Sequence, residues 1–224
     1  MGTMTSRQER LALQLFDIGA IKFGAFRLKL HETHPDAPLS PIYLNLRTAD
    51  NPKPGPITPE IVDEIGQQLY SLAQLVQISY SHVAGVPRAG DPFAEAFSRA
   101  STFGHHPPPL LRLRKDETPD LRHVSAVLEG TYRRGDRVLL IDDLITQAGS
   151  KLEAIRALRE TGLVVHDVLV LVDREQGGSR QLQEFNCQLH AVFSLSPLLD
   201  LYLERGKIPQ AMRDEVSAYL ATNT

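Results

Sequence analysis

The hydrophobic positions of this chain follow two different spacings. From about residue 58 onwards, short apolar runs alternate with segments in which apolar residues recur every three or four positions. The clearest runs are Val138–Ile141 and Val164–Val172, and the clearest helical stripe contains Ile61, Ile65 and Leu69. Short apolar runs are typical of buried parallel strands, and the longer spacing is typical of helices with one buried face. Their alternation predicts an α/β fold with a mostly parallel, twisted sheet flanked by helices.

Local signals mark where several helices begin. Thr58 is an N-cap candidate before Pro59, and Asp91-Pro92 opens the next helix. Ser150 and Glu153 form an S-x-x-E capping box, which predicts that a helix begins there. The same patterns predict further helices at Arg7–Ile18, Ser179–Asn186, from Ser196 and at Gln210–Leu220, and further strands at Lys22–Leu30, Ser40–Arg47, His82–Val86, Leu110–Arg114, Ala126–Leu128 and Leu189–Phe193.

These elements predict a single domain over residues 1–224. Its core is expected at roughly 58–195, followed by C-terminal helices at 196–221. Residues before about 50 are expected to form a small N-terminal hood, which a polar, proline-bearing insertion at His31–Leu39 interrupts. Lys115–Ser125 is polar and has no apolar period, so we expect a mobile loop there.

Composition narrows the class of protein. A hydrophobic content of 42% with 23% charged residues is ordinary for a globular chain. The net charge of −3 argues against a nucleic-acid-binding protein, which is usually basic. The lone Cys187 fits a reducing compartment, and no apolar run is long enough for a signal peptide or a membrane span. We therefore expect a cytoplasmic protein. His31 and His34 are more readily explained as loop residues than as metal ligands, so no protein metal site is predicted.

Candidate chemistry follows the run Val138–Ile141. Two adjacent carboxylates, Asp142 and Asp143, stand at the end of this predicted strand, and a loop of small residues then leads into a helix. Open α/β sheets bind ligands at the carboxyl ends of their strands, and a helix start offers free N–H groups to a phosphate. The pattern fits a ligand with hydroxyls and a phosphate, such as a phosphorylated ribose. An acidic strand end before an ordinary helix is the alternative.

Several motifs carry a resemblance to a known family. Leu140–Thr146, with the loop after it, resembles the phosphoribosyl pyrophosphate (PRPP) motif of type I phosphoribosyltransferases. From about Leu15 to Leu203 the chain resembles the orotate phosphoribosyltransferases in particular. The other motifs that carry the resemblance are Lys22–Lys29, Ser40–Tyr43, Gly85–Pro87 and Leu171–Gly178.

The resemblance implies a role for each candidate site residue. As catalytic residues it implies Asp142 and Asp143, which would hold the ribose hydroxyls, together with Arg114 and Lys115 of a mobile loop that reaches the neighbouring subunit of a homodimer. Lys29 would reach the active site from the hood, Arg88 lies in the pyrophosphate loop and Arg174 would bind orotate. Mg²⁺ would accompany PRPP. The 5′-phosphate would be held by the loop residues Thr146, Ala148, Gly149 and Ser150.

Four departures from the family pattern weaken the catalytic part of this prediction. Thr118 stands where the family has the lysine of its mobile loop, and Pro119 follows it. Gln147 intervenes in the phosphate loop, so that either the loop is longer or Ala148 replaces a glycine. Arg88-Ala89-Gly90 lacks the lysine that many relatives have, and the His31–Leu39 insertion follows Lys29 directly.

The sequence therefore favours an orotate phosphoribosyltransferase-like protein that binds PRPP or a nucleotide and has weak or no standard activity. Such a protein would act as a module that responds to its ligand or binds a protein partner. The alternative is an active enzyme that makes orotidine monophosphate from orotate and PRPP in pyrimidine synthesis. Transfer to another base is a further alternative, which the Arg174 segment disfavours. A phosphohydrolase that uses two aspartates would need Asp-x-Asp spacing, so that both side chains leave the strand on one side. Asp142 and Asp143 are adjacent and do not have this spacing.

Overall fold

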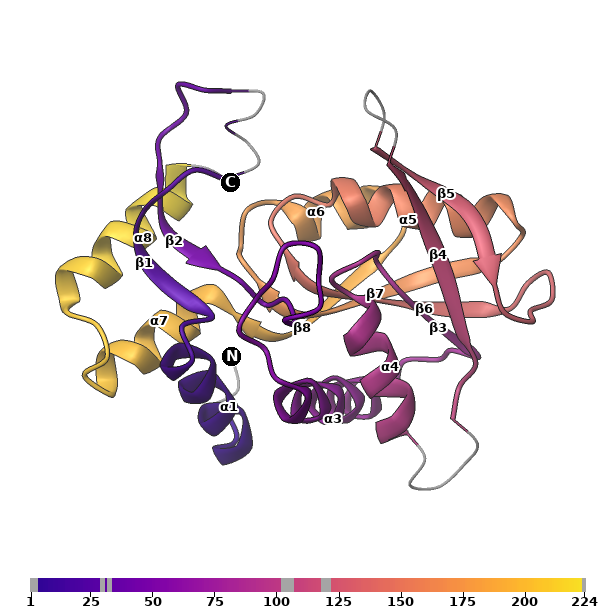
Figure 1. Ribbon diagram of the computed structural model, residues 1–224, viewed down its shortest axis with the longest axis horizontal. Helices are drawn as coiled ribbons and strands as arrows, with labels where there is room; N and C mark the ends of the chain where they lie inside the picture. The colour runs from indigo at the N-terminus through magenta and orange to yellow at the C-terminus, as the bar shows by residue number, and fades with distance from the viewer. Residues whose placement is uncertain (1–3, 29–30, 32–33, 102–106, 118–121, 223–224) are drawn as a thin grey trace.

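A computed structural model describes residues 4–28, 31, 34–101, 107–117 and 122–222 of the chain, and for 115–117 and 122–128 it describes the backbone alone. Six strands of this part form the main sheet, in the order β5-β4-β3-β6-β7-β8 (Figure 1). All neighbouring strands pair in parallel except β4 and β5. The predicted α/β fold with a mostly parallel sheet is confirmed. The strands are β3 (His82–Gly85), β4 (Leu110–Glu117), β5 (Arg122–Glu129), β6 (Arg137–Ile145), β7 (Val164–Asp173) and β8 (Gln188–Ser194).

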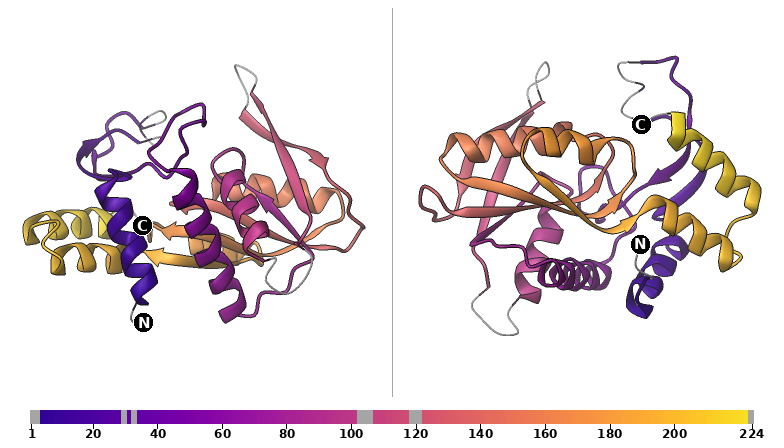
Figure 2. Two further views of the ribbon diagram at one scale, coloured as in Figure 1. Left: turned by 60° about the horizontal axis from the view of Figure 1, so that its bottom comes forward. Right: turned by 180° about the vertical axis from the view of Figure 1, so that it is seen from behind.

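Helices cover both faces of the sheet (Figures 1 and 2): α3 (Pro59–Leu75) and α4 (Asp91–Ala100) lie on one face, and α5 (Gly149–Glu160) and α6 (Gly178–Glu184) on the other. The central strand β6 is buried between them. Leu139 and Ile141 belong to the apolar cluster that contains α3 and α4, whereas Val138 and Leu140 belong to the cluster that contains α5. Because alternate side chains are buried on opposite faces, the strand reads as one continuous apolar run.

The predicted hood is a two-stranded antiparallel ribbon of β1 (Ile21–Phe26) and β2 (Ser40–Leu44). Both strands are shorter than predicted, because their pairing runs only from Ile21↔Leu44 to Phe26↔Ser40. Figure 1 shows the ribbon at one end of the molecule, beside α1 (Ser6–Asp17), α7 (Leu195–Glu204) and α8 (Gln210–Thr222).

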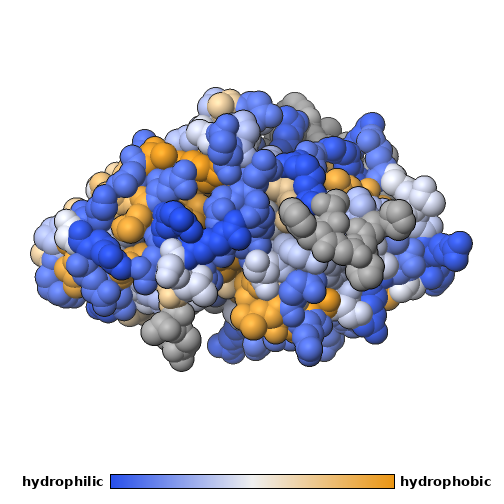
Figure 3. Space-filling view, turned by 90° about the horizontal axis from the view of Figure 1, so that it is seen from below, coloured by the Kyte–Doolittle hydropathy of each residue, from blue (hydrophilic) through white to orange (hydrophobic). Residues whose placement is uncertain are grey.

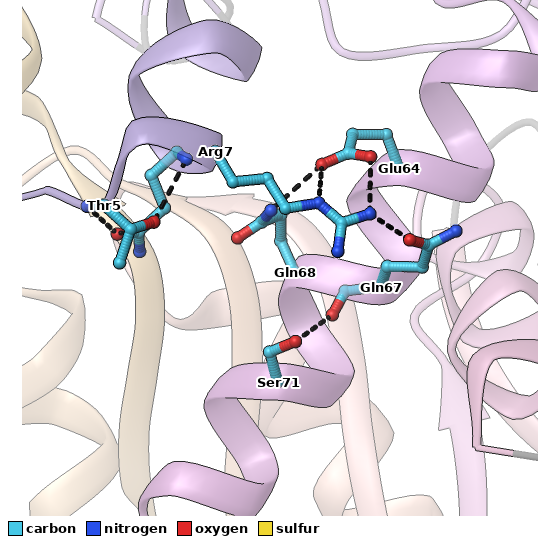
Figure 4. Close-up of polar contacts among 7 residues, drawn as sticks. Thr5, Arg7, Glu64, Gln67, Gln68 and Ser71 are labelled. Carbon is cyan, nitrogen blue, oxygen red and sulfur yellow. Dashed lines mark hydrogen bonds and ion pairs between the residues drawn. The ribbon is translucent and has the colours of Figure 1, made fainter. Parts of the chain in front are cut away.

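Polar contacts tie α1 to α3 (Figure 4). The Arg7 guanidinium donates hydrogen bonds to both oxygens of Glu64, at 2.8 and 2.9 Å, and a further one to Gln67. The predicted start of α3 is confirmed, since the Thr58 hydroxyl accepts a hydrogen bond from the Ile61 N–H. The cap thus sets the start of α3, and an exposed bidentate ion pair links that helix to α1.

The prediction of a loop at Lys115–Ser125 is wrong for the described part of that segment. β4 continues to Glu117 and β5 begins at Arg122, and the two strands pair with Lys115 opposite Val124. Backbone hydrogen bonds make this hairpin, and they need no apolar period in the sequence. Thr118 and Pro119, which the sequence singled out, lie outside the described residues.

Figure 3 shows one face of the molecule, on which hydrophilic residues predominate and apolar residues occur in small separate groups. Such scattered apolar groups are normal on a protein surface. In the part of the chain that the structure describes, every helix is too short or too polar to cross a membrane.

Candidate functional site

The two adjacent acids lie within the central strand β6, whereas the sequence analysis placed them directly after it. β6 continues to Ile145, with Leu144 opposite Val172 and Ile145 opposite Asp173 of β7. The neighbouring strand β3 ends earlier, at Gly85 opposite Ile141. Asp142 and Asp143 therefore lie at the carboxyl end of the sheet, beside the end of β3. They are 3% and 9% exposed, so both carboxylates are held within the protein.

Each carboxylate has hydrogen-bond partners close to it in sequence. Asp142 Oδ1 accepts a hydrogen bond from the Asp143 N–H at 2.9 Å, and Asp143 Oδ1 accepts one from the Leu144 N–H at 2.7 Å. Asp142 Oδ2 lies 2.5 Å from Lys151 Nζ. Burial raises the pKa of Asp143, the neighbouring Asp142 raises it further, and Lys151 acts in the opposite direction. Ligand groups that donate hydrogen bonds would favour the ionised pair.

The loop after the acids is short and is held by α6. Only Thr146, Gln147 and Ala148 separate β6 from α5. The Thr146 carbonyl accepts a hydrogen bond from the Gly178 N–H at 3.0 Å, and the Ala148 N–H donates to the Gln181 side chain at 2.7 Å. The predicted capping box is wrong: α5 begins at Gly149, its N-cap is Ala148, and no side chain caps it. Contacts with α6, not a local cap, set the start of this helix.

The start of α5 can accept an anion. The N–H groups of Gly149, Ser150 and Lys151 stand in the first helical turn, where no carbonyl of the same helix can accept from them. A Cβ at Gly149 would meet no atom within 4 Å, so the space beside this residue is open. Free N–H groups next to open space are a suitable binding place for a phosphate.

The loop between β3 and α4 packs directly against the acids. The Val86 N–H donates to the Ile141 carbonyl at 2.8 Å. A Cβ at Gly90 would lie 2.3 Å from the same carbonyl oxygen and 3.0 Å from the Asp142 Cα, so only glycine allows this approach. Arg88 lies in this loop and lines a cavity of about 810 Å³ together with Asp91 and Arg112.

Asp91 is a third carboxyl group near the acid pair. Burial raises its pKa to about 6; Arg112 opposes this effect and Asp142 adds to it. Asp91 opens α4, as predicted from the Asp-Pro pair, but no pattern in the sequence indicates that it lies near Asp142. The site therefore holds more negative charge than the acid pair alone.

Arg174 joins the core of the site to the hood. Its backbone N–H donates to the Ile145 carbonyl at 2.9 Å, and its Nη2 donates to the Ser40 hydroxyl at 3.3 Å. The side chain is 3% exposed, and its Nε lacks a hydrogen-bond partner among the described residues. A buried guanidinium N–H without an acceptor is costly. A ligand oxygen at Nε would remove that cost.

The predicted site residues on the core of the sheet lie near one another, whereas those predicted on the mobile loop at 114–115 lie on the β4–β5 hairpin. Asp142 and Asp143 lie at the carboxyl end of the sheet beside the start of α5, and the segments that carry Arg88 and Arg174 pack against the same end of β6. The Arg88 side chain itself lines the cavity next to Asp91, and the Arg174 side chain reaches Ser40 of the hood. Arg114 instead forms an exposed ion pair of 2.8 Å with Glu129 on the β4–β5 hairpin. The structure gives only the backbone of Lys115, and Lys29 lies outside the described residues.

The sequence interpretation missed Lys151 and Gln181. Lys151 stands in the first turn of α5, where the helix dipole favours an acid. A lysine at such a position is a signal that its charge is neutralised by another group. Gln181 carries no comparable signal, because its contact with Ala148 spans 33 residues.

The site could contribute ligands to a metal ion without enclosing one. Within the described ranges no three His, Cys, Asp or Glu side chains gather as a metal site. Mg²⁺ typically binds one or two carboxylates together with water and substrate phosphates. The Asp142–Asp143 pair fits that partial role.

The chain is similar to known proteins in sequence and in fold. No protein-family model matches the chain. It is 33% identical over 214 residues to the uridine 5′-monophosphate synthase of Bos taurus, covering 95% of this chain and 40% of that protein. It is 32% identical over 135 residues to the orotate phosphoribosyltransferase of Aquifex aeolicus, covering 60% and 72%. The structure of Leishmania donovani UMP synthase matches at 31% identity with a TM-score of 0.77, covering 96% and 42%. The chain spans about two fifths of the length of such synthases.

Proposed function

Because the chain belongs to the orotate phosphoribosyltransferase family, we propose that it transfers the phosphoribosyl group of PRPP to orotate. The products are orotidine monophosphate and pyrophosphate. The observation that carries this proposal is the buried acid pair Asp142–Asp143 beside the uncapped start of α5. The sequence alone favoured weak or no activity, but the likeness to transferases and synthases supports the active enzyme better.

Each part of the site has a task in this reaction. Asp142 and Asp143 accept hydrogen bonds from the ribose hydroxyls, and the N–H groups at the start of α5 bind the 5′-phosphate. The unpaired Nε of Arg174 donates to an oxygen of orotate, which explains why a buried guanidinium is left with a free N–H. These contacts fix C1 of the ribose opposite the attacking nitrogen.

The bond from C1 to the pyrophosphate oxygen breaks as the orotate nitrogen forms its bond to C1, and the proton of that nitrogen passes to the released pyrophosphate or to water. Positive charge develops on the ribose ring, and the buried carboxylates stabilise it. Arg88, in the loop after β3, neutralises the departing pyrophosphate. Mg²⁺ bound with PRPP would supply further positive charge to that leaving group.

A second candidate function is ligand binding without turnover. It is favoured by the hydrogen bond from the Ala148 N–H to Gln181, which removes one loop amide from the phosphate site. A protein of this kind would bind PRPP or a nucleoside monophosphate and respond to it, with or without a protein partner.

We further propose that the chain forms a homodimer. The β4–β5 hairpin projects from the edge of the sheet (Figure 1). Arg114, midway along β4, is exposed. A projecting hairpin can reach the site of a second copy across a two-fold axis. Sedimentation at micromolar concentration tests this, and a monomer alone would contradict it.

Two measurements on the same protein separate these functions. Incubation with orotate, PRPP and Mg²⁺ should consume orotate, seen as loss of its absorbance. PRPP should also raise the melting temperature, since a ligand at a hundredfold excess over Kd adds about 2.7 kcal/mol of stability. Asp142→Asn with Asp143→Asn should abolish both effects, and Asp200→Asn, in an exposed ion pair with Arg213, should leave both intact. A thermal shift without turnover would favour the second candidate, and neither effect would refute both.

A further inference from the structure

A lysine is buried against the acid pair. Lys151 is 4% exposed, and its Nζ lies 2.5 Å from Asp142 Oδ2 and donates to the Leu144 carbonyl at 2.6 Å. Both partners belong to β6, while the lysine belongs to the first turn of α5. The side chain therefore joins the first turn of α5 to the end of β6. A buried ammonium needs such partners, because burying it unpaired would cost several kcal/mol.

The Lys151 ammonium pairs with a carboxylate oxygen that could otherwise bind a metal ion. Asp142 Oδ1 already accepts a hydrogen bond from the Asp143 N–H, and Asp142 Oδ2 is paired with Lys151. A divalent cation at Asp142 would therefore have to share these oxygens with the N–H and the ammonium, and it would lie close to the positive charge of Lys151. At the same time, Lys151 reduces the formal charge of the three side chains from −2 to −1, which lowers their repulsion of an incoming polyphosphate.

We propose that Lys151 is a positioning residue that acts as a built-in cation of the ribose-phosphate site. It holds Asp142 in place, disfavours a divalent cation on the acid pair before PRPP arrives, and makes the site more attractive to the anionic substrate. The metal ion then enters with PRPP. The anion part of this inference rests on the proposed function, whereas the metal part stands on the geometry of Lys151 and Asp142 alone.

A purely structural ion pair would behave differently when it is removed. If the ion pair served only to maintain structure, its removal would weaken the binding of every ligand of the site. Loss of a built-in cation strengthens binding of a metal ion and weakens binding of an anion. Opposite changes for two ligands are therefore the distinguishing result.

The test uses Lys151→Met, which removes the charge and keeps an unbranched side chain. Two titrations of the free protein are compared: Mn²⁺ alone, followed by its electron paramagnetic resonance signal, and PRPP without metal, followed by calorimetry. We expect Mn²⁺ to bind roughly tenfold tighter and PRPP roughly tenfold weaker than in the unmodified protein. Lys151→Arg should keep both affinities near their original values. Adding Asp142→Asn to Lys151→Met should remove the gain in Mn²⁺ affinity.

Arg159 provides the matched control. It is a partly buried cation in the last turn of the same helix, bonded to the carbonyls of Phe185 and Val165 and remote in sequence from the acids. Arg159→Met should lower stability and leave both titrations unchanged. If Lys151→Met does not fold, Lys151→Gln, whose amide can still donate a hydrogen bond, decides by the same titrations.

The inference would be overturned if the folded Lys151 variant bound Mn²⁺ with unchanged affinity. It would also be overturned if the variant bound both Mn²⁺ and PRPP more weakly. Either outcome differs from a failure of the proposed function. If Lys151→Met shows the opposite shifts while the unmodified protein never converts orotate, the transferase proposal is contradicted and the role of Lys151 is supported.

Discussion

Asp91→Asn should stabilise the protein, and by an amount that depends on pH. The Asp91 carboxyl packs at the start of α4 so closely that a Cβ at Gly85 would lie 2.7 Å from its Oδ1. Burial raises its pKa from 3.8 to about 6, which Arg112 opposes and Asp142 reinforces. A pKa difference of about two units corresponds to roughly 3 kcal/mol. An anion in the first helical turn returns about 0.5 kcal/mol, so the net gain for the variant should be roughly 2 kcal/mol.

The direction of the pH dependence follows from the raised pKa. Between about pH 4 and pH 6 the folded protein keeps the Asp91 proton that the unfolded chain has lost. The contribution of this group to stability is therefore complete below about pH 4 and is lost as the pH rises through about 6. Asparagine cannot ionise, so the two proteins should be similar at the acid end and should diverge towards neutral pH.

Urea unfolding from about pH 4 to about pH 8 measures this difference directly. Glu60→Gln is the control, because Glu60 likewise stands beside a proline in the first turn of its helix. Its pKa is lowered, however, mainly by a hydrogen bond with Thr58. Its contribution is present above its unfolded pKa and is lost as the pH falls. The Glu60 variant should therefore lose stability relative to the unmodified protein as the pH rises. Parallel stability curves for the Asp91 variant and the unmodified protein would refute the reasoning.

Two further substitutions test the packing of the site and its contact with the base. Gly90→Ala would place a Cβ 2.3 Å from the Ile141 carbonyl oxygen, and we expect a loss of roughly 1–3 kcal/mol by thermal unfolding; an unchanged melting temperature would show that the loop can move away from β6. Arg174→Met should raise the KM for orotate and leave PRPP binding nearly unchanged, because it removes the unpaired Nε; equal losses for both substrates in steady-state kinetics would contradict the assigned contact.

The sequence by itself determined the class of fold and the centre of the site. A strand buried on both faces must be apolar throughout, so Val138–Ile141 could be recognised without a structure. Thr58 beside Pro59 marked the start of α3 for an equally local reason. Asp142 and Asp143 follow a recognisable strand, so their place at the carboxyl end of the sheet was predictable to within a few residues. Such signals depend on neighbours in the chain.

Only the tertiary structure decided which groups meet the acids. Asp91 approaches Asp142 because Gly90 lets its loop touch β6, and no spacing in the sequence records that contact. Helix α5 begins before the predicted capping box, because the Gln181 side chain of another helix accepts a hydrogen bond from the Ala148 N–H. Lys151 could be read as an ordinary helix residue until its ammonium was placed on Asp142. Burial and charge pairing arise between segments that are distant in sequence, and they set the chemistry of the site.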